Sequence, residues 1–502
     1  MTIKDDLELM HRYQKEIFLL DRIRALLSWD METYMPKDAI KFRAEQKAYL
    51  SSMIHEKNSS DELFETLKRL TSYIDSENLS NQDRINIQKL YRDVEKSRKI
   101  PLDFVKELSK AKSLSFAAWQ EAREKKDFSI FKPHLEKIVE LKKREAKYIS
   151  LPGHPYNSLL DDYEEGMTIE RLKPQFEYLK TEIKKLLNEI KISETFKNQE
   201  TKLMKKEFSP ENQMKLAKHV MEKMGLGKEF SRVDFAEHPF ATHLGHNDVR
   251  ITTNVRDHPM FAFHSTIHES GHALYESNFP EEFLYTVLYD APSLGLHESQ
   301  SRFWEIMIGS SKDFWEHYFV HFDKHYDLDG KKDLWYKEIN MVEPSLIRIE
   351  SDEVHYPLHI IMRFEIEMGL IDGTIKVEDL PKVWDEKMKE YIGVVPDSDK
   401  DGVLQDVHWC QGYFGYFPTY ALGSIYASQL LEALKKEIPE IEVDIRNGDF
   451  SRIRNWLKEK IHKHGRTKLA DEIIKEVCDE GLNPEIYVNY LKKKYKELYE
   501  LE

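Results

Sequence analysis

Glycine and proline are scarce in this sequence, with 19 glycines and 18 prolines among 502 residues. Because these residue types interrupt helices and build tight turns, their scarcity favours long helices. Up to about residue 230, apolar residues recur at three- and four-residue intervals, as in the segment 103–126. Ser209-Pro210-Glu211 has the form of a helix start, with a capping serine and a proline in the first turn. We therefore expect a mostly all-α protein.

One segment departs from the helical pattern. Between Phe230 and Asn254, β-branched and aromatic residues form short runs that Pro239 and Gly245 interrupt. This pattern predicts a small antiparallel β-sheet at about residues 230–254, beside the helix that follows. Helical patterns resume at His258 and continue to the end. We expect a single domain over residues 1–502, with helical halves on either side of a deep groove.

Composition and charge exclude several classes of protein. Hydrophobic residues make up 40% of the chain, enough for a substantial core. The formal net charge of −15 argues against a nucleic-acid partner, whose phosphates would be repelled. No apolar run approaches the ~18 residues of a membrane span, and the start does not resemble a signal peptide. Cys410 and Cys478 are the only cysteines, which excludes a disulfide framework. We expect a cytoplasmic protein with neither membrane nor nucleic-acid partners.

The sequence His268-Glu269-Ser270-Gly271-His272 carries the strongest chemical signal. Residues four apart lie on one face of a helix, so both imidazoles can bind one zinc ion, while Glu269 borders the water held by that ion. Zinc lowers the pKa of such a water, and a carboxylate beside it can move a proton to a leaving amine. The alternative is a surface helix with two unrelated histidines. The apolar stripe of this segment and a glycine inside the helix favour a closely packed helix instead.

A catalytic zinc needs a third protein ligand and one open position. Glu298, 26 residues after His272, is our candidate, because this separation lets a following helix return alongside the first. His297 and His264 are the competing donors, and each could instead be a polar neighbour of the site. In several zinc peptidases an acid four residues beyond the ligand glutamate orients a histidine. Here that position is Arg302, so the orienting acid must come from elsewhere.

These motifs together resemble the thermostable carboxypeptidase family typified by a Thermus aquaticus enzyme. The similarity runs from about residue 8 to 498 and departs from the family pattern at Ser351, where the family has alanine. The matching segments are HESGH at 268–272, DVRIT at 248–252, HESQSR at 297–302, IRIESD at 347–352 and GVLQDVHW at 402–409.

The resemblance implies a helical fold with a long substrate groove, related in shape to angiotensin-converting enzyme and neurolysin. It also implies a homodimer that releases single C-terminal amino acids from peptides with a free C-terminus, with broad side-chain tolerance. One zinc ion per chain is implied, for which cobalt often substitutes.

The matched motifs supply further candidate site residues. A terminal carboxylate can be bound by an arginine through two charge-assisted hydrogen bonds, and Arg348 is the first candidate, with Arg250 as the second. His408 and Tyr420 resemble the histidine and tyrosine that stabilise the oxyanion in related enzymes. Apart from the resemblance, the arginines could form structural salt bridges and the other two could be core residues. Residues that could shape the groove or orient ligands are Asp248, Gln405, Asp406 and Trp409.

Three other functions compete with the metallocarboxypeptidase. An endo-oligopeptidase of the same fold class is the nearest, since the metal motif does not determine where a peptide is cut. An aminopeptidase lacks support, because no GxMEN-type amine-binding signature is present. A helical binding protein that holds a metal without catalysis is disfavoured by the intact Glu269, which binding alone would not require.

Overall fold

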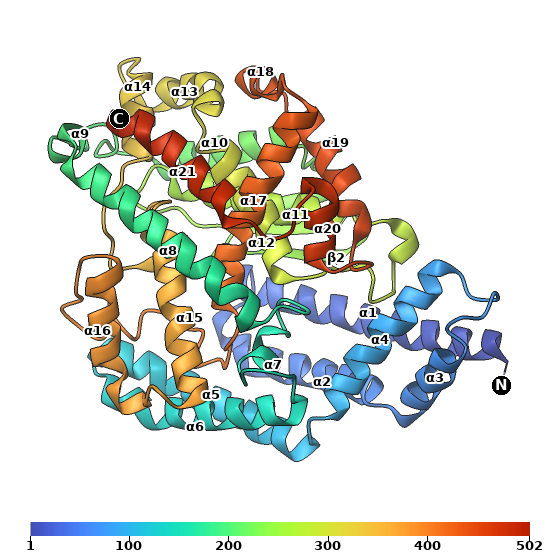
Figure 1. Ribbon diagram of the computed structural model, residues 1–502. Helices are drawn as coiled ribbons and strands as arrows, with labels where there is room; N and C mark the ends of the chain where they lie inside the picture. The colour runs from blue at the N-terminus through green and yellow to red at the C-terminus, as the bar shows by residue number, and fades with distance from the viewer. Residues whose placement is uncertain (1) are drawn as a thin grey trace.

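The computed structural model describes residues 2–502 and is built mostly of helices (Figure 1). The first part contains α1 (Ile3–Thr33), α2 (Ile40–Asn58), α3 (Asp61–Ser72), α4 (Asn81–Arg98), α5 (Leu102–Lys125), α6 (Phe128–Ile149), α7 (Asn157–Leu160), α8 (Ile169–Ile192), α9 (Glu194–Lys197) and α10 (Pro210–Met224). The second part contains α11 (Phe261–Ser277), α12 (Leu294–Arg302), α13 (Lys312–Tyr326), α14 (Lys332–Ile339), α15 (Tyr356–Asp372), α16 (Leu380–Tyr391), α17 (Phe417–Glu437), α18 (Ile441–Arg446), α19 (Ser451–Lys460), α20 (Ala470–Cys478) and α21 (Pro484–Tyr499). The predicted all-α class is confirmed.

Short helical turns join several of these helices. Five are 3₁₀ turns: η1 (Lys37–Ala39), η2 (Glu281–Phe283), η4 (Arg348–Glu350), η5 (Val377–Asp379) and η6 (His462–His464). The sixth, η3 (Phe303–Ile308), is a π-helical turn that continues α12. Within residues 2–502, no helix combines the length and apolar character needed to cross a bilayer.

Local sequence signals start the helices where expected. The Ser209 hydroxyl caps α10 by accepting a hydrogen bond from the backbone N–H of Asn212, 3.3 Å away, and Pro210 occupies the first helical position. The predicted helix start is therefore confirmed. At the front of α1, Thr2 and Asp5 form a reciprocal capping box, which satisfies backbone donors that the first turn leaves free.

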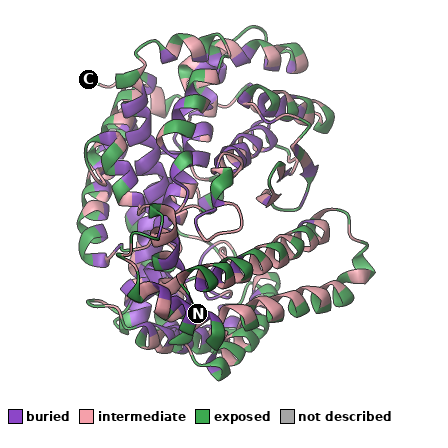
Figure 2. Ribbon diagram, turned by 90° about the vertical axis from the view of Figure 1, so that its right-hand side faces the viewer, coloured by how far each residue is buried: buried purple, intermediate pink, exposed green. Residues whose placement is uncertain are grey.

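The helices pack around one large apolar core, to which α17 contributes a helix with most of its residues buried. A second, small core joins α1, α3 and α4, where Met10 packs with Leu63 and Leu67. Figure 2 shows buried helices in the body of the molecule, whereas the helix pair beside the N-terminus is mostly half-buried or exposed. The N-terminal helices are thus held to the body by limited apolar contact.

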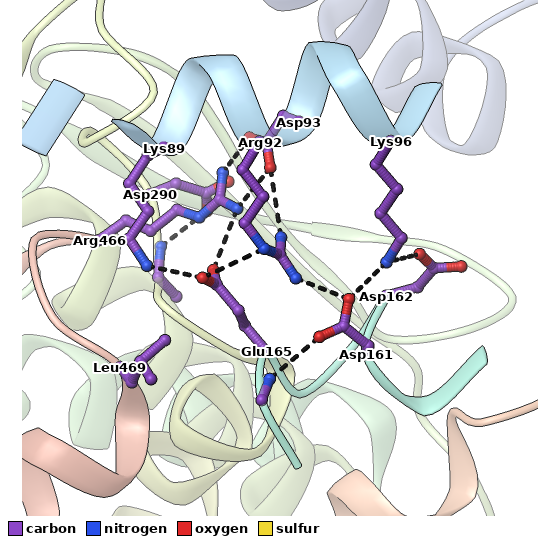
Figure 3. Close-up of polar contacts among 12 residues, drawn as sticks. Lys89, Arg92, Asp93, Lys96, Asp161, Asp162, Glu165, Asp290, Arg466 and Leu469 are labelled. Atoms are coloured by element: carbon purple, nitrogen blue, oxygen red, sulfur yellow. Dashed lines mark hydrogen bonds and ion pairs between the residues drawn. The ribbon is translucent and has the colours of Figure 1, made fainter. Parts of the chain in front are cut away.

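A network of ion pairs joins α4 to two loops of the body (Figure 3). Arg466 donates to both carboxylate oxygens of Asp93, at 2.5 and 2.9 Å. Arg92 and Lys96 both bind Asp161, in the loop after α7, at 2.6 and 2.7 Å. Because Asp161 is buried and the other four side chains are only partly exposed, the pairs are screened less than fully exposed surface pairs.

The small sheet contains β1 (Ser231–Phe235), β2 (Ala241–Gly245) and β3 (Asp248–Thr253) in the order β1-β3-β2. The predicted position of the sheet is confirmed, but the prediction that all its strands are antiparallel is wrong. The β2–β3 pair is antiparallel and the β1–β3 pair is parallel. Parallel neighbours need a crossover of about a dozen residues, and here residues 236–247, which include β2 itself, supply it.

Candidate active site

The centre of the candidate site is α11, which carries His268, Glu269 and His272. Gly271 lies on the side of this helix that faces α12. A Cβ atom added there would lie 2.6 Å from the carbonyl oxygen of Gln300 and 2.7 Å from the Cα atom of Ser301. Only glycine permits so close an approach of the two backbones, which accounts for a residue that is otherwise unfavourable inside a helix.

A second glycine allows α17 to approach the opposite side of α12 closely. A Cβ atom added to Gly423, on α17, would lie 2.5 Å from the Cγ atom of Glu298. Helix α12 therefore lies tightly between α11 and α17, with Ser293 capping its first turn through the backbone N–H of Leu296. This packing holds Glu298 against the two histidines.

The ligand atoms of His268, His272 and Glu298 all lie within 4.8 Å of one another. Oε2 of Glu298 is 3.6 Å from Nε2 of His268 and 3.5 Å from Nε2 of His272. Two ligands of a tetrahedral zinc ion lie about 3.4 Å apart, because each sits about 2.1 Å from the ion. Two imidazoles and one carboxylate at this spacing fit a divalent metal ion. The three predicted ligands are thus brought together.

Burial and the charges of neighbouring side chains determine the protonation states of the metal ligands and of Glu269. Burial alone would raise the pKa of Glu298, but the neighbouring imidazoles, His268 foremost, hold it well below its usual range. Burial lowers the pKa of His272 to about 4, which keeps this imidazole neutral and able to bind a metal. Burial also raises the pKa of Glu269 to about 7, with the Glu298 charge acting in the same direction and the His268 charge against it. A carboxyl with this pKa can both accept and release a proton near neutrality.

Glu305 supplies the orienting acid that the sequence did not reveal. Its Oε2 atom lies 2.9 Å from Nδ1 of His268 and 3.2 Å from Nη1 of Arg302. Glu305 follows Glu298 by seven residues, or about two helical turns, and lies in the π-helical turn η3. The sequence signal for it is an acid two turns beyond Glu298 rather than one turn beyond.

The two competing histidines do not join the metal ligands. Nε2 of His297 lies 2.8 Å from Oε1 of Glu276, and its ring stacks on that of His272 with centroids 4.2 Å apart. His264 is one turn before His268, and burial lowers its pKa to about 4. Neither belongs to the group of converging ligand atoms. Both therefore fit the alternative expectation of polar neighbours.

The site opens into a cavity of about 540 Å³, whose lining includes all three ligands, Glu269, Arg348 and Tyr420. Phe240 and Ala241, at the start of the edge strand β2, form part of the wall. A second cavity of about 500 Å³ shares Leu294 and His297 with the first and extends to the ion pairs of Figure 3. The two adjoining cavities match the expected groove.

Arg348 is buried and belongs to a network of two arginines and one aspartate. Its Nε atom donates to Oδ1 of Asp406 at 3.1 Å, and Nε of Arg363 donates to Oδ2 of Asp406 at 2.6 Å. Gln405 accepts hydrogen bonds from the Arg348 backbone N–H and from the Arg363 guanidinium. One carboxylate between two guanidinium groups leaves an excess of positive charge beside the cavity. Nothing in the local sequence of Arg363 marks it for this role.

His408 and Tyr420 lie together, with Nε2 of His408 3.3 Å from the Tyr420 hydroxyl. Burial lowers the pKa of His408 to about 3, outweighing the nearby charge of Asp406, so its imidazole is neutral. The guanidinium of Arg348 lies over the Tyr420 ring, 4.9 Å from its centroid. Three of the candidate residues therefore meet beside the cavity.

Six of the candidates, His408 and Asp406 among them, do not line this cavity. Gln405 lies behind Arg348, as described above. The buried Trp409 donates from its indole Nε1 to Oε1 of Glu367 at 2.9 Å. Asp248 and Arg250 pair with each other on β3 at 3.0 Å, and Arg250 stacks on Trp29 of α1.

Comparison with known proteins agrees with this geometry. Residues 9–495 match the family described as carboxypeptidase Taq (M32) metallopeptidase. Carboxypeptidase 1 of Bacillus subtilis is 39% identical, over 98% of this chain and 99% of its own length. Thermostable carboxypeptidase 1 of Pyrococcus furiosus is 36% identical, over 98% of each chain.

Solved structures show the same architecture. The M32 carboxypeptidase from Deinococcus radiodurans superposes with a TM-score of 0.95 at 34% identity, covering 99% of this chain and 100% of that one. A Pyrococcus furiosus carboxypeptidase superposes with a TM-score of 0.94 at 35% identity, covering 98% and 99% of the two chains.

Proposed function

Because the chain belongs to the carboxypeptidase Taq (M32) metallopeptidase family, and is therefore a metallocarboxypeptidase, we propose that it uses zinc to remove single C-terminal residues with broad specificity. The observation that carries this proposal is the convergence of His268, His272 and Glu298 beside the buried Glu269. Cobalt, with similar ligand preferences, is expected to substitute for zinc.

Glu269 is the proposed general base. When bound, zinc would polarise the scissile carbonyl and lower the pKa of a water molecule. Glu269 takes a proton from that water and passes it to the leaving amine. Its pKa of about 7, raised by burial, suits both transfers near neutral pH.

Tyr420 and His408 are proposed to stabilise the oxyanion. The tetrahedral intermediate needs hydrogen-bond donors placed before the charge develops. Tyr420 lines the cavity, and Nε2 of His408, 3.3 Å from the Tyr420 hydroxyl, holds its orientation or supplies a second donor. Because the His408 imidazole is neutral, it attracts the terminal carboxylate of the substrate less strongly than the charged Arg348 does.

Arg348 is proposed to bind the terminal carboxylate of the substrate. It lines the cavity, whereas Arg363 is wholly buried behind it. Asp406 is shared between these two guanidinium groups, so Arg348 retains charge and donors for a second carboxylate. Gln405 holds the Arg348 backbone in place.

The remaining family-motif residues are proposed to act at a distance from the reacting bond. Trp409, buried and hydrogen-bonded to Glu367, is proposed to hold the backbone beside His408 in place. Asp248 and Arg250, with Trp29, shape the end of the groove where the sheet meets α1. We further propose that the enzyme works in the cytoplasm as a homodimer and that all 502 residues form one carboxypeptidase domain.

The exopeptidase proposal is tested with one peptide in two forms, one with a free C-terminus and one with a C-terminal amide. The zinc-loaded enzyme should release single residues from the free form and leave the amide nearly intact, because Arg348 finds no carboxylate there. Equal cleavage of both peptides at internal bonds would favour an endo-oligopeptidase. Mass spectrometry of the products distinguishes these outcomes.

A further inference from the structure

Three histidines gather on the outer side of the molecule, on helices that do not carry the metal ligands of the active site. His317 and His321 lie one turn apart on the same face of α13, and His219 faces them from α10. The rings of His219 and His321 lie 4.6 Å apart between centroids, and those of His317 and His321 lie 5.7 Å apart. In Figure 1, α13 lies at the top of the view, whereas α11 and α12 lie near the middle.

These separations are similar to that of the proposed metal-binding pair of the active site. The rings of His268 and His272 lie 5.0 Å apart, between the two values of the outer group. Two imidazoles one helical turn apart are a known arrangement for binding zinc. A third imidazole from a neighbouring helix adds a donor of the type that zinc, nickel and copper prefer.

The three imidazoles have the protonation state that metal binding requires. Burial lowers the pKa of each of the three histidines, so all three are neutral at physiological pH, as a ligand must be. The Nε2 atom of His219 is buried and has no hydrogen-bond partner within residues 2–502. A buried polar atom of this kind needs an explanation, and a bound ion would provide one.

His317 is held from behind by the loop after α18. A Cβ atom added to Gly448 would lie 2.3 Å from Nε2 of His317, so that edge of the ring points at this loop. A hydrogen bond to the Arg446 backbone works against the effect of burial on the His317 pKa. Metal-binding histidines usually donate their second ring nitrogen to a carbonyl in this way, which leaves the other nitrogen free.

We propose that His219, His317 and His321 form a second site for a divalent transition metal ion, with zinc as its simplest occupant. The site is separate from the active site and does not depend on the peptidase function proposed above. Its role is to tie α10 to α13 across the surface of the protein.

Two features of the surroundings determine how tightly this site binds. Among residues 2–502, only the active-site ligands already converge within 4.8 Å, so the outer imidazoles must rotate to meet an ion. Rotation about the terminal side-chain bond of histidine costs little energy. Lys223 lies near all three histidines and Glu222 near His219 alone; both are exposed, so water screens the repulsion that Lys223 exerts on a cation. We therefore expect weaker binding than at the active site.

The test is equilibrium dialysis of the full-length enzyme against micromolar free zinc, followed by metal analysis. We expect about two ions per chain for the wild type. His219→Asn and His321→Asn each remove one of the three donors and should each weaken the second site by at least about 10- to 100-fold, the scale of effect seen when only the partner of a metal ligand is lost. Peptidase activity should be unchanged in both variants, because neither residue lines the catalytic cavity.

His134→Asn, on α6, is the matched control and should retain both ions. Circular dichroism and peptidase activity establish that each variant is folded, and His317→Asn serves as a further variant if one of the others is not. A wild-type protein that binds a single ion under these conditions would overturn the proposal. So would a second ion that persists in all of the folded outer-site variants.

Discussion

The Nδ1 atom of His268 lies 2.9 Å from Oε2 of Glu305, although 37 residues separate them in the chain. Arg302 binds the same carboxylate oxygen at 3.2 Å. The burial of Glu305 would raise its pKa, but Arg302 and His268 lower it to about 2, so the carboxylate is charged. A charged acceptor at Nδ1 fixes the tautomer of His268 and points the Nε2 lone pair at the metal position.

Glu305→Gln should therefore weaken metal binding. The amide still accepts a hydrogen bond, but it lacks the charge that makes the imidazole a stronger ligand, and we expect a loss of about tenfold to 100-fold in zinc affinity. Competition with a chromophoric chelator measures this affinity independently of catalysis. Glu386→Gln, at an exposed glutamate, is the control. Unaltered affinity in Glu305→Gln would show that Glu305 has no orienting role.

Glu269→Gln should separate metal binding from catalysis. The amide cannot accept the proton of the attacking water, so kcat should fall by about 100- to 10,000-fold. The three ligand side chains are untouched, and metal content should remain that of the wild type. Steady-state kinetics and metal analysis of the same preparation check both parts. A variant with normal turnover would exclude Glu269 as the base.

Arg348→Ala should raise KM for peptides with a free C-terminus. Hydrogen bonds between charged groups contribute about 1.5–3 kcal/mol, which corresponds to roughly a tenfold to 100-fold change. Arg250→Ala should have a smaller effect on dipeptide hydrolysis, because Arg250 pairs with Asp248 outside the cavity. If the two variants changed KM in the opposite order, Arg250 would be the better candidate for the carboxylate site.

Gly271→Ala should push α12 away from α11. The added methyl group meets backbone atoms at 2.6 and 2.7 Å, and such overpacking costs about 1–3 kcal/mol of stability. Metal affinity should fall as well, because Glu298 moves with α12. Gly227→Ala is the control, since the nearest atom there is the mobile carboxylate of Glu229. Thermal unfolding with and without zinc measures both effects, and a variant as stable as the control would contradict the close packing.

Asp161→Asn should loosen the attachment of α4 to the body. Burial raises the pKa of Asp161, but Lys96 and its other partners bring it below the ordinary value of 3.8. A lowered pKa means that the ionised side chain stabilises the folded state above that value and that this contribution is lost as the pH falls. We expect a loss of about 1–3 kcal/mol at neutral pH that shrinks in acid. Asp61→Asn, which breaks an exposed pair with Arg98, should cost little at any pH.

Much of the candidate site could be predicted because a helix is a local structure. The four-residue spacing of His268 and His272 places both on one face of α11, and the cap at Ser209 acts through the next three residues. The general position of the sheet also followed from local residue types. Such features depend on near neighbours in the chain, and the sequence therefore contains them directly.

Other features depend on how distant segments pack. Gly271 indicated a close approach, but only the folded chain identifies α12 as the partner and brings Glu298 to the histidines. Glu305 and Arg363 have no local signal, because their partners lie on other helices. The parallel pairing of β1 with β3 likewise depends on which side of β3 the chain passes. The sequence determined the chemistry of each helix face, and tertiary packing decided which faces meet, because the energy of those contacts arises only when the helices come together.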